Sequence, residues 1–200
     1  EGAAGRVAAA QRAPRRDHRP ALGAGPGLAV DQLVRAARDQ RRDPAGVDRL
    51  EEHPRIFSLT PGQFGGTLSW YASPKGDLLH TDGLMATDAE WVLERCARQP
   101  ERPFFLTVGF FRPHTPYVAP KKYFDLYPLE KIDVPALPAG YEKTVPPGAL
   151  GSTKPWPNFG TTVEQARLTK RAYYAAISFV DAQIGRVVDA LDRLGLPQQL

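Results

Sequence analysis

Residues 103–117 read PFFLTVGFFRPHTPY, and this stretch decides the fold class. Residues 103–111 form a nearly continuous apolar run that is rich in aromatic and β-branched side chains. Such a run predicts a strand buried on both faces, as in a parallel sheet covered by helices. The expected fold is therefore α/β, with a central, mostly parallel sheet flanked by helices.

The chemistry changes immediately after this run, where a cation and an imidazole follow as Arg112 and His114. Ligands of open α/β sheets bind at the carboxyl ends of the strands. Pro113 and Pro116 bracket His114 and limit its backbone, which suits a side chain that must be held for catalysis. His114 is thus a candidate catalytic residue. The alternative is a structural histidine with satisfied hydrogen bonds at the end of a strand.

A helix is predicted before the apolar run. Met85, Ala89, Val92, Leu93 and Cys96 follow one another at helical spacings up to Pro100. Asp82 stands where an N-cap would, and Leu68–Tyr71 is expected to lie over a core further upstream. A metal site made by His80 and Asp82 is disfavoured, because a cap explains Asp82 and an exposed loop position explains His80.

A second, longer helix is predicted near residue 200. Thr161 and Glu164 have the spacing of a capping box, and Gly195 and Pro197 stop the pattern. The expected apolar stripe repeats every three or four residues and comprises Tyr173, Ile177, Val180, Ile184, Val187, Leu191 and Leu194. A coiled coil would suit this period, but with only three heptads we expect the helix to dock against a sheet.

The first quarter of the chain differs in composition from the rest. Residues 1–50 hold 10 Arg, no Lys, six acids and no aromatic residue, so they carry the whole net charge of +4. Two segments are therefore expected: a basic segment rich in Ala, Arg, Gly and Pro at 1–42, either disordered or misread from its gene, and a globular segment at 43–200. Between the two helices, residues 128–160 carry seven prolines and predict a long surface excursion.

Several classes of protein are excluded by composition. Residues 51–200 are neutral overall and the basic segment has no aromatic side chain for base stacking, so no nucleic-acid partner is expected. No run approaches the roughly 20 apolar residues of a membrane span, and no signal peptide is evident. The single cysteine, Cys96, cannot form an intramolecular disulfide, and its place on the helical stripe favours a buried structural thiol.

Residues 103–127, PFFLTVGFFRPHTPYVAPKKYFDLY, closely resemble the central strand and following loop of sulfatases, especially the iduronate-2-sulfatase and choline-sulfatase-like branch. Three other stretches resemble that family in the same order: HTDG at 80–83, PLEKI at 128–132 and YYAAISFVDAQIGR at 173–186. The resemblance covers roughly residues 43–196. It implies the alkaline-phosphatase-like α/β fold, present here in part, and a sulfuric ester hydrolase that acts on sulfate esters, among them sulfated sugars.

The resemblance also implies cofactors. Family members use a calcium ion held by carboxylates and a formylglycine made from the cysteine of a C-x-P-S-R motif. Cys96 lies in ERCAR at 94–98, which lacks the Pro and Ser of that motif. The segment contains neither the nucleophile motif nor the metal ligands, so the isolated chain is expected to be inactive.

One active-site position carries over from the family. His114 matches the histidine of the Lys/Arg-Pro-His motif that contacts the sulfate, and its role would be hydrogen-bond donation or proton delivery to the leaving alkoxide. Arg112 stands where lysine is frequent; it either adds positive potential or pairs with an acid. Tyr117 and Lys121 complete the candidate substrate-binding set, although Lys121 and Lys122 also suit a solvated face over buried aromatics.

Two alternatives stay open at this level. One is a non-catalytic binder of sulfated glycans that uses Arg112, His114, Lys121 and Lys122. The other is a phosphoesterase of the same superfamily, which the sequence at 114–117, HTPY, argues against.

Overall fold

A computed structural model describes residues 55–64, 66–151, 154–156 and 158–196. The basic segment predicted at 1–42 lies outside the described residues. No described helix is long and apolar enough to cross a membrane.

The sheet is small and mixed. Its order is β1-β2-β3, formed by β1 (Phe57–Ser58), β2 (Ser69–Ser73) and β3 (Tyr117–Pro120). Strand β2 runs antiparallel to β1 and parallel to β3, and Trp70 is paired with Phe57 on one side and with Tyr117 on the other. Residues 69–71 of the stretch expected to lie over a core belong to this central strand, and Trp70 packs against the core from it.

Helix α3 (Thr81–Ala97) confirms the first predicted helix and follows the short turn η2 (Asp77–Leu79). Its N-cap is His80, which makes no side-chain capping bond, so the prediction that Asp82 is the N-cap is wrong. Asp82 lies one residue inside the helix and is buried. His80 is also buried, which corrects its expected exposed loop position.

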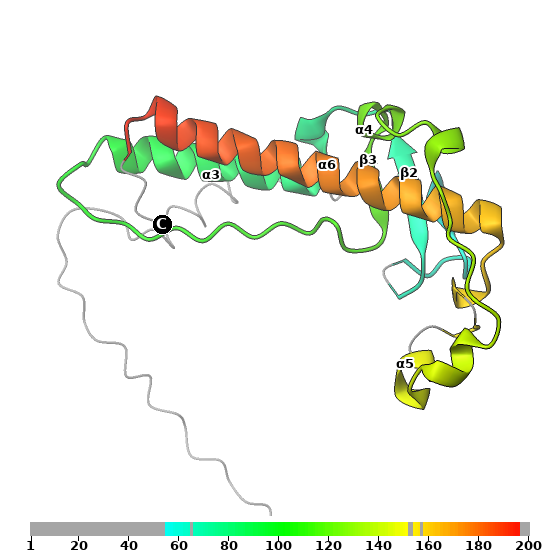
Figure 1. Cartoon of the computed structure of the whole chain (residues 1–200). Helices are drawn as coiled ribbons and strands as arrows, with labels where there is room; N and C mark the ends of the chain where they lie inside the picture. The colour runs from blue at the N-terminus through cyan, green and yellow to red at the C-terminus, as the bar shows by residue number, and fades with distance from the viewer. Residues whose placement is uncertain (1–54, 65, 152–153, 157, 197–200) are drawn as a thin grey trace, which may run out of the picture.

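The prediction of a strand at 103–111 is wrong. These residues form an extended segment without strand pairing, which returns along the helices toward β3 (Figure 1), and most of them are exposed. Phe105 is 86% exposed. A strand buried on both faces requires a neighbouring strand at each edge, and no described strand lies beside this segment.

Helix α6 (Val163–Arg193) confirms the second predicted helix with a shifted start. The capping box uses Thr162 and Gln165, one residue later than expected: the Gln165 amide donates to the Thr162 hydroxyl and the Thr162 amide to the Gln165 side chain. The helix ends where Gly195 adopts φ +62°. The Leu196 N–H then donates to the Leu191 carbonyl and that of Gly195 to the Asp192 carbonyl, a Schellman arrangement.

The core lies where α6 crosses β3 and α4 (Lys121–Asp125). Docking against a sheet is thus confirmed, but the buried face differs from the predicted stripe. The face that packs on the sheet consists mainly of alanines, which allow the helix to approach closely. The core cluster comprises Ala119, Tyr123, Phe124, Ala172, Ala175 and Phe179.

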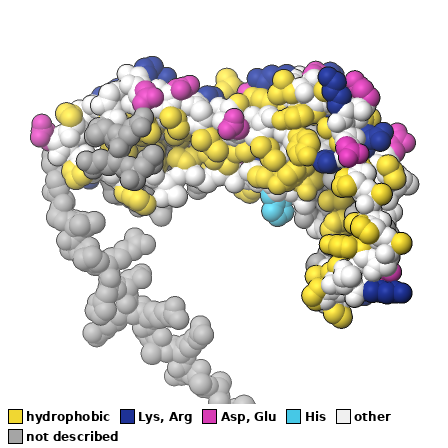
Figure 2. All heavy atoms as spheres, in the orientation of Figure 1, with side chains coloured by type: hydrophobic (Ala, Val, Ile, Leu, Met, Phe, Trp, Pro, Cys, Tyr) yellow, Lys and Arg dark blue, Asp and Glu magenta, His cyan; other side chains and the backbone are white. Residues whose placement is uncertain are grey.

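The predicted stripe instead lies partly on the surface. Of its seven residues only Val180 is buried, while Tyr173, Ile177 and Ile184 are exposed. Figure 2 shows a broad stretch of hydrophobic side chains on one face of the molecule. The 3.5-residue period located the helix correctly, but it could not distinguish a face of alanines from a face of large aliphatic side chains.

The described residues of 128–160 form the predicted excursion, with short helical turns in place of longer elements. These are η3 (Leu129–Lys131), η4 (Tyr141–Thr144), α5 (Pro147–Gly151) and η5 (Asn158–Gly160). Figure 1 shows α5 displaced from the layer formed by α3, α6 and the sheet.

Candidate functional site

The candidate site is the loop that joins the extended segment to β3, residues 111–117. Its start is fixed by Asp82, whose carboxylate accepts two consecutive backbone N–H groups. Phe111 donates to Oδ1 at 2.8 Å and Arg112 to Oδ2 at 3.0 Å. Asp82 is 1% exposed. Hydrogen bonds to a buried charge are stronger than neutral ones, so this contact fixes the loop start relative to α3.

The far side of the loop is fixed to the sheet. The Thr115 hydroxyl donates to the carbonyl of Thr67 at 3.0 Å and lies 3.1 Å from the hydroxyl of the buried Ser69. Arg112 joins the two ends of the loop, because its Nε donates to the carbonyl of Val118 at 2.7 Å. The loop is therefore tied to α3, to β2 and across its own base.

His114 lies between these anchors with an exposed side chain. Its backbone N–H donates to the carbonyl of Phe111 at 2.9 Å, which closes a turn. The ring Nδ1 lies 2.6 Å from the carbonyl oxygen of Thr115. Because a carbonyl oxygen only accepts, Nδ1 carries a hydrogen in this contact. The Nε2 atom is then an acceptor in the neutral ring and a donor in the imidazolium.

Tyr117 begins β3 beside this loop and packs edge-on against Tyr173 of α6, with ring centroids 5.5 Å apart. Burial, with a smaller contribution from Tyr173, raises the pKa of the Tyr117 phenol. Its hydroxyl therefore stays protonated at neutral pH, so it is a neutral hydrogen-bonding group.

The two lysines of α4 each engage an acid. Lys121 is exposed, and its Nζ donates to Asp125 Oδ2 at 2.7 Å. Lys122 forms an ion pair with Asp77, Nζ to Oδ1, at 2.8 Å. The structure thus brings Arg112, His114 and Tyr117 into one short loop, whereas Lys121 lies beyond β3 with its charge compensated by a neighbour.

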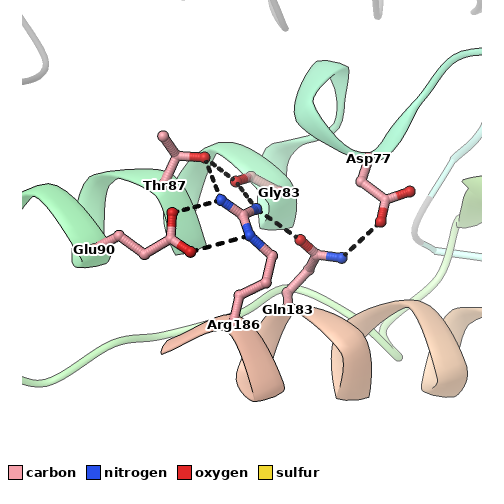
Figure 3. Close-up of polar contacts among 6 residues, drawn as sticks. All are labelled: Asp77, Gly83, Thr87, Glu90, Gln183 and Arg186. Atoms are coloured by element: carbon pink, nitrogen blue, oxygen red, sulfur yellow. Dashed lines mark hydrogen bonds and ion pairs between the residues drawn. The ribbon is translucent and has the colours of Figure 1, made fainter. Parts of the chain in front are cut away.

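Asp77 and Arg186 form a second polar cluster, shown in Figure 3. Gln183 connects them: its Nε2 donates to Asp77 Oδ2 at 3.2 Å, and its Oε1 accepts from Arg186 Nη1 at 3.0 Å. The Arg186 guanidinium makes five donor contacts in all, to Gly83, Thr87, Gln183 and twice to Glu90. A guanidinium has five N–H groups, so this one is fully satisfied. The cluster joins α3 to α6 and has a structural role.

The described residues include no group of His, Cys, Asp and Glu side chains that could hold a metal ion. Cys96 is half-buried in α3, and burial raises the pKa of its thiol. A raised pKa disfavours the reactive thiolate. The described residues therefore fit neither a calcium ion nor the reactive cysteine from which formylglycine would be made.

Sequence reasoning missed the residues that fix the loop. The position of Asp82 before an apolar helical pattern predicts a cap, and no local pattern marks Ser69. Their partners are 29 to 46 residues away in sequence, so no local spacing marks them. The sequence signal for Asp82 is an acidic residue in the first turn of a helix, where its side chain can reach the end of the next extended segment.

Comparison with known proteins gives a consistent result. A family model described as Sulfatase matches residues 57–199. A sulfatase of Formosa agariphila is 40% identical over 135 residues, which cover 65% of this chain and 26% of that protein. Human iduronate 2-sulfatase is 35% identical over 113 residues, or 47% of this chain and 19% of that enzyme. An arylsulfatase of Clostridium perfringens is 31% identical over 138 residues, or 64% and 26%. The chain thus spans a fifth to a quarter of the length of these relatives.

Proposed function

Because this chain belongs to the sulfatase family, we propose that it is a segment of a sulfuric ester hydrolase and that His114 acts on the sulfate ester. One observation carries the proposal: an exposed imidazole stands on a loop that is fixed on both sides. Hydrolysis of a sulfate monoester breaks the bond between sulfur and the ester oxygen, and that oxygen leaves as an alcohol only if it receives a proton. An imidazole is suited to this transfer near neutral pH.

The tautomer of His114 identifies the ring nitrogen that can act on the substrate. Nδ1–H is engaged by the carbonyl of Thr115, so Nε2 is the nitrogen available to the substrate. Donation through Nε2 requires the imidazolium, which either holds a sulfate oxygen by a charged hydrogen bond or passes its proton to the leaving oxygen. After proton transfer the neutral ring keeps its Nδ1–H contact, and its orientation is unchanged.

The remaining candidate residues have supporting roles in the proposal. Arg112 adds positive charge beside His114 while its Nε closes the loop, and the neutral phenol of Tyr117 supplies a hydrogen bond to the ester. Lys121 would rim an anionic pocket only after exchanging Asp125 for the substrate. The nucleophile and the metal ion of the family do not come from the described residues, so the isolated chain should release no sulfate.

A graft tests the proposal. The region of the Clostridium perfringens arylsulfatase that matches this chain would be replaced by the corresponding residues of this chain, and hydrolysis of an aryl sulfate would be measured. We expect the graft to turn over and His114→Gln to lower kcat by roughly a hundredfold or more, as for loss of a general acid. Lys131→Gln, at an exposed position of η3, is the control. Equal activity of the graft with and without the imidazole would contradict the proposal.

A further inference from the structure

We infer that Asp82 is a positioning residue for His114, an inference that rests on the proposed function. The carboxylate of Asp82 bonds the backbone just before His114. Its two oxygens accept the N–H groups of Phe111 and Arg112, the last two residues before Pro113. Both acceptors come from one side chain on the first turn of α3, which is a rigid element.

The geometry limits the alternatives for Asp82. A carboxylate that is 1% exposed needs donors, because an uncompensated buried charge is very unfavourable. Among the described residues its side-chain hydrogen bonds are to these two amides, so the burial of Asp82 and the conformation of the loop depend on each other. A residue that served only to start the helix would instead accept from the helix's own N–H groups, as Thr162 does in α6.

The restraint that Asp82 places on Phe111 is passed to His114 through the turn that these two residues close. The carbonyl of Phe111 accepts the N–H of His114, so the residue held by Asp82 in turn holds the residue with the imidazole. Arg112, the other held residue, extends its Nε to Val118 and thereby sets the width of the loop base. Asp82 thus fixes one end of the loop that contains His114, and Thr115 fixes the other through Thr67.

The test measures amide hydrogen exchange, resolved to single residues, on the full chain at low micromolar concentration. Asp82→Asn retains the size of the side chain but places an amide NH₂ opposite one backbone N–H. We expect exchange at Phe111 and Arg112 to accelerate roughly tenfold or more. The decisive readout is His114, whose amide Asp82 does not touch: its exchange should accelerate as well, and its ring resonances should shift.

Two matched variants complete the experiment. Glu94→Gln removes a carboxylate elsewhere on α3 and should leave all three amides unchanged. Asp82→Glu restores the carboxylate on a longer side chain and should recover part of the protection. The amides of Ala175 and Ala176, in the buried face of α6, report global stability and should remain within about twofold of the original protein.

The inference is overturned if His114 keeps its exchange rate and ring signals in Asp82→Asn. It is equally overturned if the α6 amides lose protection to the same extent as the loop, because Asp82 would then contribute only general stability. None of these readouts depends on turnover. A graft in which His114→Gln is fully active would contradict the proposed function while leaving the exchange result intact, so the two failures are distinguishable.

Discussion

Arg186 of α6 and Glu90 of α3 form a two-pronged ion pair, with Nη2–Oε2 at 2.7 Å and Nε–Oε1 at 3.2 Å. Both side chains are about three-quarters buried, at 27% and 22% exposure. A planar guanidinium matches a carboxylate in this geometry, whereas a lysine ammonium cannot make both bonds. The pair therefore ties α6 to α3.

Replacement of Arg186 by lysine should lower the free energy of unfolding by about 1–3 kcal/mol, because the carbonyl of Gly83 and the Gln183 side chain lose a charged donor. Urea denaturation followed by circular dichroism measures the change. Arg193→Lys, at the exposed end of α6, serves as the control and should change little. A loss no larger than that of the control would mean that the ion pair does not hold the two helices together.

A matched pair of glycine substitutions tests the close approach of α3 to η2. A Cβ at Gly83 would lie 1.9 Å from the backbone oxygen of Asp77, so Gly83→Ala should destabilise the fold by about 1–3 kcal/mol or more. A Cβ at Gly185 in α6 meets nothing within 4 Å, so Gly185→Ala should stabilise by about 0.5–1 kcal/mol. Denaturation midpoints that move in the same direction for both variants would refute this packing.

Protonation of Asp77 should lower the free energy of unfolding at acid pH. Burial acts to raise the pKa of Asp77, but hydrogen bonds from Lys122, Tyr123 and Gln183 and the Lys122 charge outweigh it and hold the pKa below 3.8. A lowered pKa in the folded state gives stability that is fully present above the unfolded value and is lost as pH falls through the folded value. Unfolding free energies of the original chain and of Asp77→Asn, measured from pH 6 to pH 3, should therefore converge toward the acid end. Parallel curves would show that the Asp77 contacts are not formed in solution.

The apolar surface should make the isolated chain poorly soluble. Phe105 is 86% and Ile184 is 45% exposed. Exposed apolar patches of this kind promote association. Phe105→Lys with Ile184→Lys should lower light scattering without loss of helical circular dichroism, whereas Ala175→Lys buries a charge in the core and should cost several kcal/mol. A monomeric original chain with a sharp cooperative melt would contradict this prediction.

The helices were predictable because their signals are local. The capping box and Gly195 mark α6 to within a residue, and apolar positions spaced three or four apart mark α3, although its N-cap is His80 and not Asp82. The sequence of 103–117 likewise indicated where the candidate site lies, since a histidine between two prolines is visible without coordinates. The family resemblance was visible for the same reason, because it rests on contiguous motifs.

The tertiary structure decided those features that depend on contacts between residues distant in sequence. Whether the apolar segment 103–111 becomes a strand depends on neighbouring strands, and the described sheet offers it none. Which face of α6 is buried depends on the shape of the surface beneath it, and alanines fit closely where isoleucines do not. Asp82 acquired its role in the same way. A carboxylate at the start of a helix can cap that helix or hold another segment, and only the approach of Phe111 and Arg112 to this buried side chain determines that it does the second.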